Sequence, residues 1–224
     1  MKKTSVLNLF VMVLLLSLGV SACKTLNKGQ KGVLIGAGAG GAVGAGVGKA
    51  AGNTALGAII GAAVGGATGG VIGRQMDKEA KEIEKISGAE VKRVGEGINV
   101  TFKAGVLFGV DKADLTSSAQ SKVKELAQVL NKYPDTYVLV EGHTDDTGSD
   151  DHNMQLSERR AKEVVAYLRQ QGLSSDRLKT AWYGKSQPKV SNATESGRAE
   201  NRRVEFAIYA TEKLVEKAKS DKAL

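Results

Sequence analysis

Apolar residues follow two different periods from residue 89 onward, and these periods divide the second half of the chain into strands and helices. Between shorter runs, apolar residues recur every three or four positions in two long stretches, which predicts helices over 116–133 and about 151–171. Strands that alternate with helices in this order predict an α/β sandwich, a single domain of ordinary size over residues 89–210. The short, densely apolar runs that predict its strands are 98–102, 105–109, 136–141, 178–184 and 202–210.

The ends of both predicted helices carry recognisable signals. Thr116 or Ser117 can cap the first helix with a hydroxyl group, and Pro134 ends it. The second helix is expected to start at Asp150 or Asp151, because a carboxylate is favoured at the positive end of a helix dipole. These signals make the positions of both helices the firmest part of the prediction.

Residues 32–76 contain a repeat in which glycine occupies every fourth position. The glycines fall at 32, 36, 40, 44, 48 and 52 and again at 57, 61, 65, 69 and 73. This spacing places them along one side of a helix, where small residues let two backbones approach closely. Such helices are unstable alone in water, since each interior glycine costs about 1 kcal/mol relative to alanine. We therefore expect a glycine-zipper helical hairpin in or on a membrane; the alternatives are a flexible tether and a soluble oligomeric bundle.

The first residues have the composition of a secretory signal. Two lysines precede a short apolar core, and small residues close it before Cys23, the only cysteine in the chain. The sequence "VSAC" resembles the lipobox of bacterial lipoproteins, which implies removal of residues 1–22, acylation of Cys23 and a lipidated linker over residues 23–31. Lys24 follows the cysteine in place of aspartate, which by the same resemblance implies the outer membrane as destination. The alternative is an ordinary secretory signal with an incidental cysteine.

The formal net charge of +8 is concentrated before the predicted domain. Residues 23–76 contain four lysines, one arginine and no acidic residue, whereas residues 89–210 contain 18 basic and 17 acidic residues. Basic residues around a lipidated, glycine-rich segment suit an anionic membrane surface. Nucleic acid would instead require a basic patch on a folded domain, so it is not expected as a partner. Two charged segments flank the domain: a helical connector over 77–88 and a fraying helical tail over 211–224.

A polar loop follows the strand predicted over 136–141, at a position where open α/β sheets usually bind ligands. Asp145 lies in this loop, and Arg160 lies beside the apolar stripe of the next helix, so the arginine is expected to be partly buried. A carboxylate and a guanidinium close together, with Thr147 and Asn153 as neutral hydrogen-bonding groups, would bind a group carrying both an ammonium and a carboxylate. The spacing is equally compatible with a structural salt bridge between Asp145 and Arg160.

Two histidines and several aspartates in the same region raise the question of a metal site. The chain contains no HExxH sequence, and the aspartates do not fit the calcium-loop pattern. His143 is expected to make structural hydrogen bonds and His152 to be exposed. No serine or cysteine has a recognisable base motif beside it, so no catalytic residue, metal or cofactor is predicted.

Three separated motifs, "GHTDDTG", "N..LSERRA" and "GRAENRRVEF", resemble the signature of the OmpA-like peptidoglycan-binding domain, in order, over roughly residues 100–210. The resemblance implies a βαβαβ sandwich with a mixed sheet that binds the diaminopimelate of peptidoglycan without covalent chemistry. Asp145 and Arg160 match the family's binding aspartate and arginine. Because adjacent strand residues alternate, Arg203 is expected to point inward and Arg202 to face solvent. The other pocket positions that the resemblance implies are Thr147, Asn153, Leu156 and Arg203.

The order of lipobox, glycine-rich segment and OmpA-like domain also resembles the YiaD-type outer-membrane lipoproteins. These features predict a non-enzymatic lipoprotein that acyl chains on Cys23 hold in the outer membrane and whose periplasmic domain binds peptidoglycan. The expected partners are peptidoglycan and outer-membrane lipid, together with homo-oligomers formed through the glycine repeat. The alternative function is a membrane oligomer or pore-like assembly built by the glycine zipper, in which wall binding is secondary.

Overall fold

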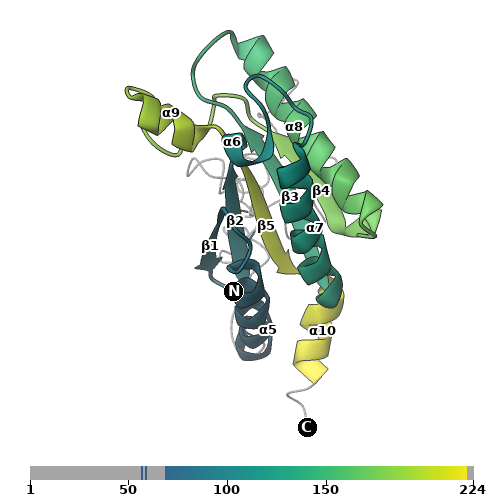
Figure 1. Cartoon of the computed structure of the whole chain (residues 1–224). Helices are drawn as coiled ribbons and strands as arrows, with labels where there is room; N and C mark the ends of the chain where they lie inside the picture. Colours follow the sequence, from purple (N-terminus) through teal and green to yellow (C-terminus); the bar gives the residue numbers. More distant parts are fainter. Residues whose placement is uncertain (1–56, 58, 60–68, 221–224) are drawn as a thin grey trace, which may run out of the picture.

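The structure, a computed structural model, describes residues 57, 59 and 69–220. The predicted signal peptide, Cys23 and most of the glycine repeat lie outside the described residues. Figure 1 shows a twisted sheet with helices packed against it. In chain order the elements are α5 (Gly69–Ile83), β1 (Ala89–Val94), β2 (Gly97–Lys103), α6 (Ala104–Leu107), α7 (Ser117–Lys132), β3 (Thr136–His143), α8 (Asp150–Gln170), the short 3-10 helix η1 (Ser175–Arg177), β4 (Leu178–Trp182), α9 (Glu195–Asn201), β5 (Arg203–Ala210) and α10 (Glu212–Ser220).

The five strands form one mixed sheet in the order β1-β2-β5-β3-β4. Only β3 and β4 are parallel; the other neighbouring pairs are antiparallel. A parallel pair needs a long crossover, and α8 provides it between β3 and β4. The last strand of the chain, β5, inserts between β2 and β3 and so takes the central position. The predicted α/β fold with a mixed sheet is confirmed.

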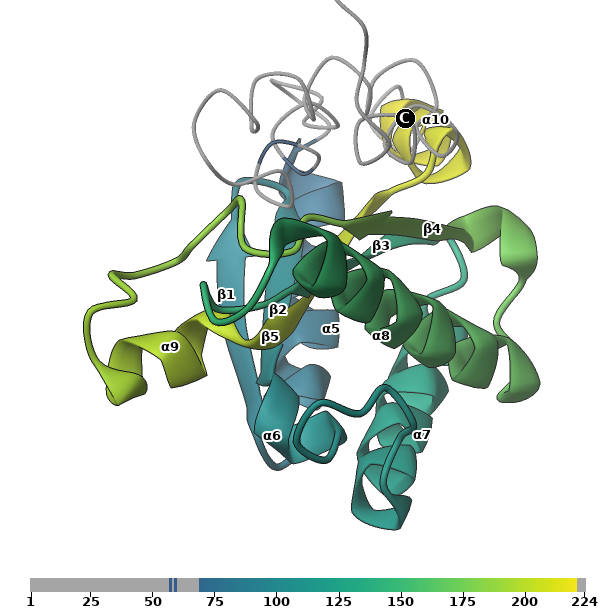
Figure 2. The same ribbon diagram turned by 90° about the horizontal axis from the view of Figure 1, so that it is seen from above.

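One face of the sheet carries the main hydrophobic core. Figure 2 shows α7 and α8 together on this side, and buried residues of α5 belong to the same core cluster. Phe102 of β2 and Phe206 of β5 meet there edge to face, with ring centroids 5.9 Å apart. Because side chains alternate along a strand, the neighbours of these residues, including Thr101 and Glu205, lie on the opposite face. Burial of each large apolar side chain contributes roughly 1.5–3 kcal/mol to the free energy of unfolding.

Both long helices lie close to their predicted positions. The hydroxyl of Thr116 caps α7 by accepting a hydrogen bond of 3.1 Å from the backbone N–H of Ala119. The cap of α8 is Ser149, whose hydroxyl accepts from the N–H of His152 at 3.2 Å. The helix begins at Asp150, as predicted, and Asp150 and Asp151 occupy its first turn. Their carboxylates lie near the positive end of the helix dipole.

The strand predicted over 105–109 is wrong. The one-turn helix α6 occupies most of this segment, and Phe108 forms only an isolated bridge with Leu115. The N–H of Ala104 donates to the carbonyl oxygen of Arg202 at 2.7 Å, and the chain turns away from the sheet at this point. β1 and α9 were not predicted at all. β1 is an edge strand in which charged residues interrupt the apolar pattern, as is common at sheet edges.

The hydrophobic core extends beyond the predicted limits of 89 and 210. α5 crosses the expected boundary at residue 76, and its Ile72, Met76 and Ile83 are fully buried. The described part of the predicted tail is not frayed, because α10 packs against α5 and buries Leu214 and Ala218. Within the part of the chain that the structure describes, no helix combines the length and apolarity needed to cross a membrane.

Glu79 lies on the buried face of α5. Both of its carboxylate oxygens are buried without a hydrogen-bond partner among the described residues. Burial raises the pKa of Glu79 to about 8, although the charge of nearby Arg177 acts to lower it. Because this pKa lies above the ordinary value of a glutamate, folding favours the protonated form. The folded state therefore loses stability as the pH rises from about 4.5 toward 8.

Replacing Glu79 by glutamine should stabilise the protein at pH 8 and have a much smaller effect at pH 5. The uncharged side chain removes the need to ionise a buried acid, and we expect a rise in Tm on the order of 5 °C at pH 8. Thermal unfolding of both proteins at the two pH values measures this difference. Glu84→Gln, a change of an exposed acid just after α5, is the matched control and should leave Tm unchanged at both pH values. An equal effect of Glu79→Gln at both pH values would contradict the assignment.

Candidate functional site

An open pocket of about 550 Å³ lies at the carboxyl end of β3, between α6, the first half of α8 and residues at both ends of α9. These elements gather at the upper end of the molecule in Figure 1. Five of the six residues predicted for a ligand pocket line it: Asp145, Thr147, Asn153, Leu156 and Arg160. The remaining lining residues that bear on its chemistry are Phe108, Asp111, His152, Glu195 and Arg202.

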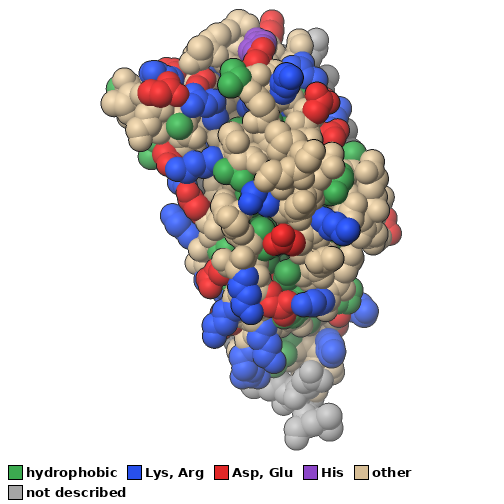
Figure 3. Space-filling view, in the orientation of Figure 1, with side chains coloured by type: hydrophobic (Ala, Val, Ile, Leu, Met, Phe, Trp, Pro, Cys, Tyr) green, Lys and Arg blue, Asp and Glu red, His purple; other side chains and the backbone are tan. Residues whose placement is uncertain are grey.

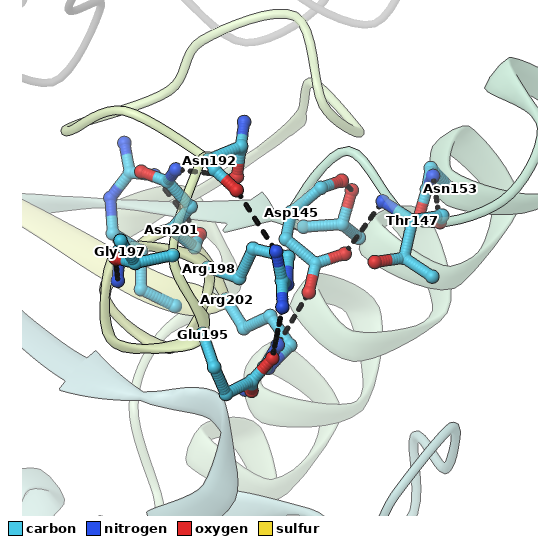
Figure 4. Close-up of polar contacts among 12 residues, drawn as sticks. Asp145, Thr147, Asn153, Asn192, Glu195, Gly197, Arg198, Asn201 and Arg202 are labelled. Carbon is cyan, nitrogen blue, oxygen red and sulfur yellow. Dashed lines mark hydrogen bonds and ion pairs between the residues drawn. The ribbon is translucent and has the colours of Figure 1, made fainter.

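Asp145 is held in the loop after β3 by two hydrogen bonds that it accepts. Its Oδ1 accepts from the backbone N–H of Thr147 at 2.9 Å, and its Oδ2 accepts from Nη1 of Arg202 at 2.5 Å. The other end of the same guanidinium, Nη2, donates to Oε1 of Glu195 at 2.7 Å. Figure 4 shows Arg202 between the two carboxylates. Asp145 is only 6% exposed, so its position is set by these contacts.

The electrostatics of the pocket keep Asp145 ionised. Burial acts to raise the pKa of Asp145, but the hydrogen bonds from Arg202 and Thr147 outweigh burial and hold the pKa below its ordinary value. A carboxylate oxygen can accept more than one hydrogen bond, so a further cationic donor can still bind Asp145. The side chain is therefore a fixed negative charge at neutral pH.

The turn that follows Asp145 is braced by the first residues of α8. Nδ2 of Asn153 donates to the carbonyl oxygen of Thr147 at 2.8 Å, as Figure 4 shows. Gly148 has a φ of 89°, a left-handed conformation in which glycine avoids the steric penalty of a side chain. This turn directs Thr147 and Asn153 into the pocket, and Leu156, one turn further along α8, adds an apolar surface.

Arg160 lies deep in the pocket wall, with only 4% of its surface exposed. Its Nε donates to the carbonyl oxygen of Lys112 at 2.9 Å, and its guanidinium carbon lies 5.1 Å from the centre of the Phe108 ring. Nη1 is buried and has no hydrogen-bond acceptor among the described residues. Burial lowers the pKa of Arg160, while the charge of Asp111 acts to raise it. An arginine remains charged under such a shift, so an unmet cationic donor borders the pocket.

The structure rules out one alternative and corrects the assignment of one arginine. Asp145 and Arg160 do not form a salt bridge, because Asp145 pairs with Arg202 and Arg160 donates to a backbone carbonyl. The expectation that Arg202 faces solvent is wrong: it lines the pocket and pairs with two carboxylates. Arg202 follows the last residue of α9 and precedes β5, so strand alternation does not govern its direction.

Arg203, the sixth predicted pocket residue, does not line the pocket. It is the first residue of β5, and its side chain is buried on the sheet face opposite the main core. Its Nε donates to Oε1 of Glu205 at 2.5 Å, and the other oxygen of Glu205 accepts from Asn99. Arg203 does point inward, as predicted. It is buried on the face of the sheet that does not carry the pocket, so it cannot contact a ligand there. Arg203 supports the site by fixing the first residues of β5.

Asn201 connects the same region to the preceding loop. Its buried side-chain oxygen accepts from the N–H groups of Lys189 and Val190 at 2.8 and 3.0 Å, and its Nδ2 donates to the carbonyl oxygen of Val190. These bonds hold α9 in place, and α9 presents Glu195 and Arg202 to the pocket. The three consecutive residues of the "NRR" segment thus have separate roles: Asn201 binds the preceding loop, Arg202 pairs with Asp145 and Glu195, and Arg203 pairs with Glu205.

The two histidines differ in environment. His143 is buried and stacks on Tyr183, and burial lowers its pKa to about 3, so it is neutral at physiological pH. His152 is exposed, as predicted, and Nε2 of its ring lies 2.9 Å from a carboxylate oxygen of Asp111 across the pocket rim. In the region covered by the structure, no three His, Cys, Asp or Glu side chains gather as a metal site would require.

The close packing of α8 on β3 positions the pocket wall. A Cβ atom added to Gly142 would lie 2.2 Å from the carbonyl oxygen of Ser157, so only glycine permits this approach. The hydroxyl of Ser157 accepts from the N–H of Gly184 at 2.9 Å and ties α8 to the end of β4. Because Asn153, Leu156 and Arg160 all project from this part of α8, their positions depend on the contact at Gly142.

The arrangement combines a fixed anion, an unmet cationic donor, neutral hydrogen-bonding groups and an apolar wall in one open pocket. None of these groups forms a nucleophile–base pair, and two of them carry opposite charges. It is suited to a small zwitterionic group, whose ammonium would meet Asp145 and whose carboxylate would meet Arg160.

Comparison with known proteins agrees with this geometry. Residues 107–202 match the model of the OmpA family, and residues 1–77 match that of a YMGG-like Gly-zipper. The probable lipoprotein YiaD of Escherichia coli (strain K12) is 39% identical over 122 residues, which make up 54% of this chain and 56% of that protein. The peptidoglycan-associated lipoprotein of Legionella pneumophila is 39% identical over 105 residues, 47% of this chain and 60% of that protein.

A solved structure shows the same fold. The cell wall anchor of the T6SS from Pseudomonas aeruginosa superposes with a TM-score of 0.54 and 27% identity, over 60% of this chain and 96% of that one. The resemblances predicted from the motifs are therefore confirmed. This chain spans less than two thirds of either lipoprotein relative. The names of these three relatives describe lipoproteins and a wall anchor, not enzymes, in agreement with the prediction of a non-enzymatic protein.

Gly142→Ala should destabilise the domain and displace the pocket wall. The added methyl group would overlap the backbone of α8, and overpacking of this kind typically costs about 1–3 kcal/mol or more. Thermal unfolding measures the loss as a lower Tm. Gly70→Ala is the matched control, because a Cβ atom at that position has no atom within 4 Å. A Gly142→Ala variant with the Tm of the wild type would show that the contact between α8 and β3 is not tight.

Proposed function

We propose that the OmpA-like domain of this chain holds the cell wall by binding, without covalent chemistry, the diaminopimelate side chain of peptidoglycan stem peptides. The free end of diaminopimelate carries an ammonium and a carboxylate on one carbon, which is the class of ligand that the pocket suits. The observation that carries the proposal is the buried Nη1 of Arg160, which has no acceptor within the described residues, in the same pocket as ionised Asp145. The names of the relatives, a peptidoglycan-associated lipoprotein and a wall anchor, support it.

Arg160 is assigned to the ligand carboxylate. A buried donor without an acceptor lowers the free energy of unfolding by about 1–3 kcal/mol, so Arg160 carries this cost in the ligand-free protein. A carboxylate that accepts from the guanidinium supplies this missing acceptor and forms a charge-assisted hydrogen bond. The Phe108 ring beneath the guanidinium and the bond to Lys112 hold the side chain in place before the ligand arrives. Preorganisation of this kind lowers the entropy lost on binding.

Asp145 is assigned to the ligand ammonium. Its two existing bonds fix the carboxylate, and the remaining lone pairs can accept from an ammonium group. Thr147 and Asn153 supply neutral polar groups beside it, and Leu156 covers the methylene chain of the ligand. Arg202 is assigned a positioning role, because its guanidinium is already engaged by Asp145 and Glu195.

We further propose that acyl chains on Cys23 attach the protein to the outer membrane. The support is the lipobox-like sequence before Cys23, Lys24 after it, and the similarity to two lipoproteins. In this layout a signal peptide (1–22) is removed, and a lipidated linker (23–31) and the glycine-zipper segment predicted over 32–76 lie at the membrane, except residues 69–76, which belong to α5 and pack in the domain core. The folded domain reaches the wall in the periplasm. The match of residues 1–77 to a YMGG-like Gly-zipper is consistent with self-association of this segment.

Asp145→Asn and Arg160→Ala should each abolish sedimentation of the protein with purified diaminopimelate-type peptidoglycan. Loss of one charged partner in such a site weakens binding by about 30-fold or more. Asp146→Asn and Arg159→Ala are the matched controls, since both change an exposed neighbour by the same chemistry and should bind as the wild type does.

Free meso-diaminopimelate should compete with peptidoglycan for the wild-type protein, and less effectively at high salt because both contacts are ionic. Lysine-type peptidoglycan should bind poorly, because lysine lacks the second carboxylate. A folded Asp145→Asn variant, checked by its Tm, that still sediments fully would refute the pocket assignment.

Cys23→Ala should remove the protein from the outer-membrane fraction or leave it as an uncleaved precursor in the inner membrane. The acyl chains are expected to supply most of the membrane affinity, since each buried methylene contributes about 0.8 kcal/mol. Fractionation followed by mass spectrometry of the N-terminal peptide measures both outcomes. Thr25→Ala, two residues away, is the control and should fractionate normally. If Cys23→Ala remains entirely in the outer membrane, the glycine-rich segment alone is a sufficient anchor.

A further inference from the structure

The outer face of α5 carries a stripe of basic residues. Arg74, Lys78 and Lys81 lie on the helix, and Lys85 follows two residues beyond its end. Their spacings of four, three and four residues place them on one side, and all four side chains are exposed. The stripe is not part of the pocket and has no role in the proposed wall binding.

The packing of α5 fixes the direction of this stripe. Ile72, Met76 and Ile83 lie on the opposite side of the helix and are fully buried in the core. The helix is therefore held against the domain, and its basic face must point away from it. The first exposed charge after the glycine repeat, Arg74, is consequently a cation in a fixed orientation, and Lys78 and Lys81 share its side of the helix.

The acidic residues of the same segment do not neutralise the stripe. Asp77 pairs with Arg93 of β1, Glu82 pairs with Lys132 and Tyr133 of α7, and Glu79 is buried. Within the described residues, none of the four basic side chains takes part in an ion pair. Glu84 is the one exposed acid of residues 74–85 that also has no ion pair there. The stripe thus has an excess of positive charge directed at solvent.

The space-filling view places this charge at one end of the molecule. Figure 3 shows Lys and Arg side chains gathered over the lower part, where Figure 1 places α5 and β1. Exposed Lys217 of α10, an element that contacts α5, adds a further cation at this end. The pocket lies at the opposite, upper end, beside α6 and α9.

We propose that the basic face of α5 docks on an anionic phospholipid surface and so orients the domain with its pocket directed away from the membrane. An anionic lipid surface is the expected partner because its charge is complementary to the stripe. Chain order agrees, since α5 begins at Gly69, inside the glycine repeat whose preceding part is assigned to the membrane. Each lysine or arginine near an anionic membrane contributes about 1 kcal/mol, and the attraction fades within a Debye length of roughly 8–10 Å. The inference goes beyond wall binding but rests on the proposed membrane attachment of the preceding segment.

The test measures how closely the domain approaches the lipid in the acylated, full-length protein. Acylation would occupy Cys23, so a cysteine introduced at exposed Ser87, just after α5, can be labelled alone with a fluorescent donor. Energy transfer to headgroup-labelled lipid is then compared in neutral phosphatidylcholine vesicles and in vesicles that also contain phosphatidylglycerol. We expect higher transfer in the anionic vesicles and a fall to the neutral-vesicle value at high salt.

The charge-reversal pair Lys78→Glu and Lys81→Glu should remove this difference. Each lysine at the surface is expected to raise the ratio of docked to free domain about fivefold. Loss of two lysines should therefore lower this ratio by roughly 25-fold or more. The matched control reverses Lys124 of α7 and Arg169 of α8, both exposed and outside the stripe, and should keep the wild-type transfer. Equal transfer in both kinds of vesicle, or no change in the Lys78→Glu, Lys81→Glu variant, would overturn the proposal.

Wall binding gives an independent readout. The Lys78→Glu, Lys81→Glu variant should sediment with peptidoglycan as the wild type does, and its Tm should be unchanged because both side chains are exposed. Failure of the pocket assignment would appear as normal sedimentation of Asp145→Asn, whereas failure of membrane docking would appear only in the energy transfer. A loss of sedimentation in the stripe variant would overturn the proposal by showing that the stripe contacts the wall.

Discussion

Arg202 joins the three segments that surround the pocket, and the geometry of the site depends on its contacts. Its guanidinium bridges Asp145, in the loop after β3, and Glu195, at the start of α9. Its carbonyl oxygen accepts from the N–H of Ala104 and so starts α6, which carries the chain toward Phe108. One residue therefore sets the position of the anionic group, the helix beside it and the segment that lies against Arg160. Without Arg202, burial would act to raise the pKa of Asp145 with less to oppose it.

Among the described residues, Arg160 and Glu79 are buried ionisable groups with atoms that lack a hydrogen-bond partner, and they differ in what they face. Arg160 borders an open pocket, where a ligand carboxylate can provide the missing acceptor. Glu79 lies between α5 and the core, and burial favours its protonated form. In the proposed function, the ligand completes the hydrogen bonding of Arg160. Glu79 lowers stability as the pH rises toward 8, in the helix that connects the domain to the glycine repeat.

The two ends of the molecule have different chemistry. The pocket, with its fixed anion and unmet guanidinium donor, lies beside α6, α9 and the first half of α8, whereas α5 and α10 form the other end (Figure 1). Both of these helices carry exposed lysines. The proposed link between a membrane and the wall requires two attachment surfaces that lie apart, because the wall lies at a distance from the lipid. The packing of α5 into the core makes this separation a property of one rigid domain, since the helix that leaves the glycine repeat cannot rotate freely relative to the pocket.

The amino-acid sequence by itself determined the periodic elements and the residues of α8 that line the pocket. α7, α8 and the central strands follow from local periodicity and caps, and Asn153, Leu156 and Arg160 share one helix face because of helix geometry. Tertiary structure alone decided which arginine of "NRR" meets Asp145: Arg202 lies between α9 and β5, and Arg203 begins the strand and turns to the far side of the sheet. It also decided that residues 104–107 form a helix and that α10 packs on α5. In these places a short segment has no period of its own, so contacts from distant parts of the chain determine its conformation.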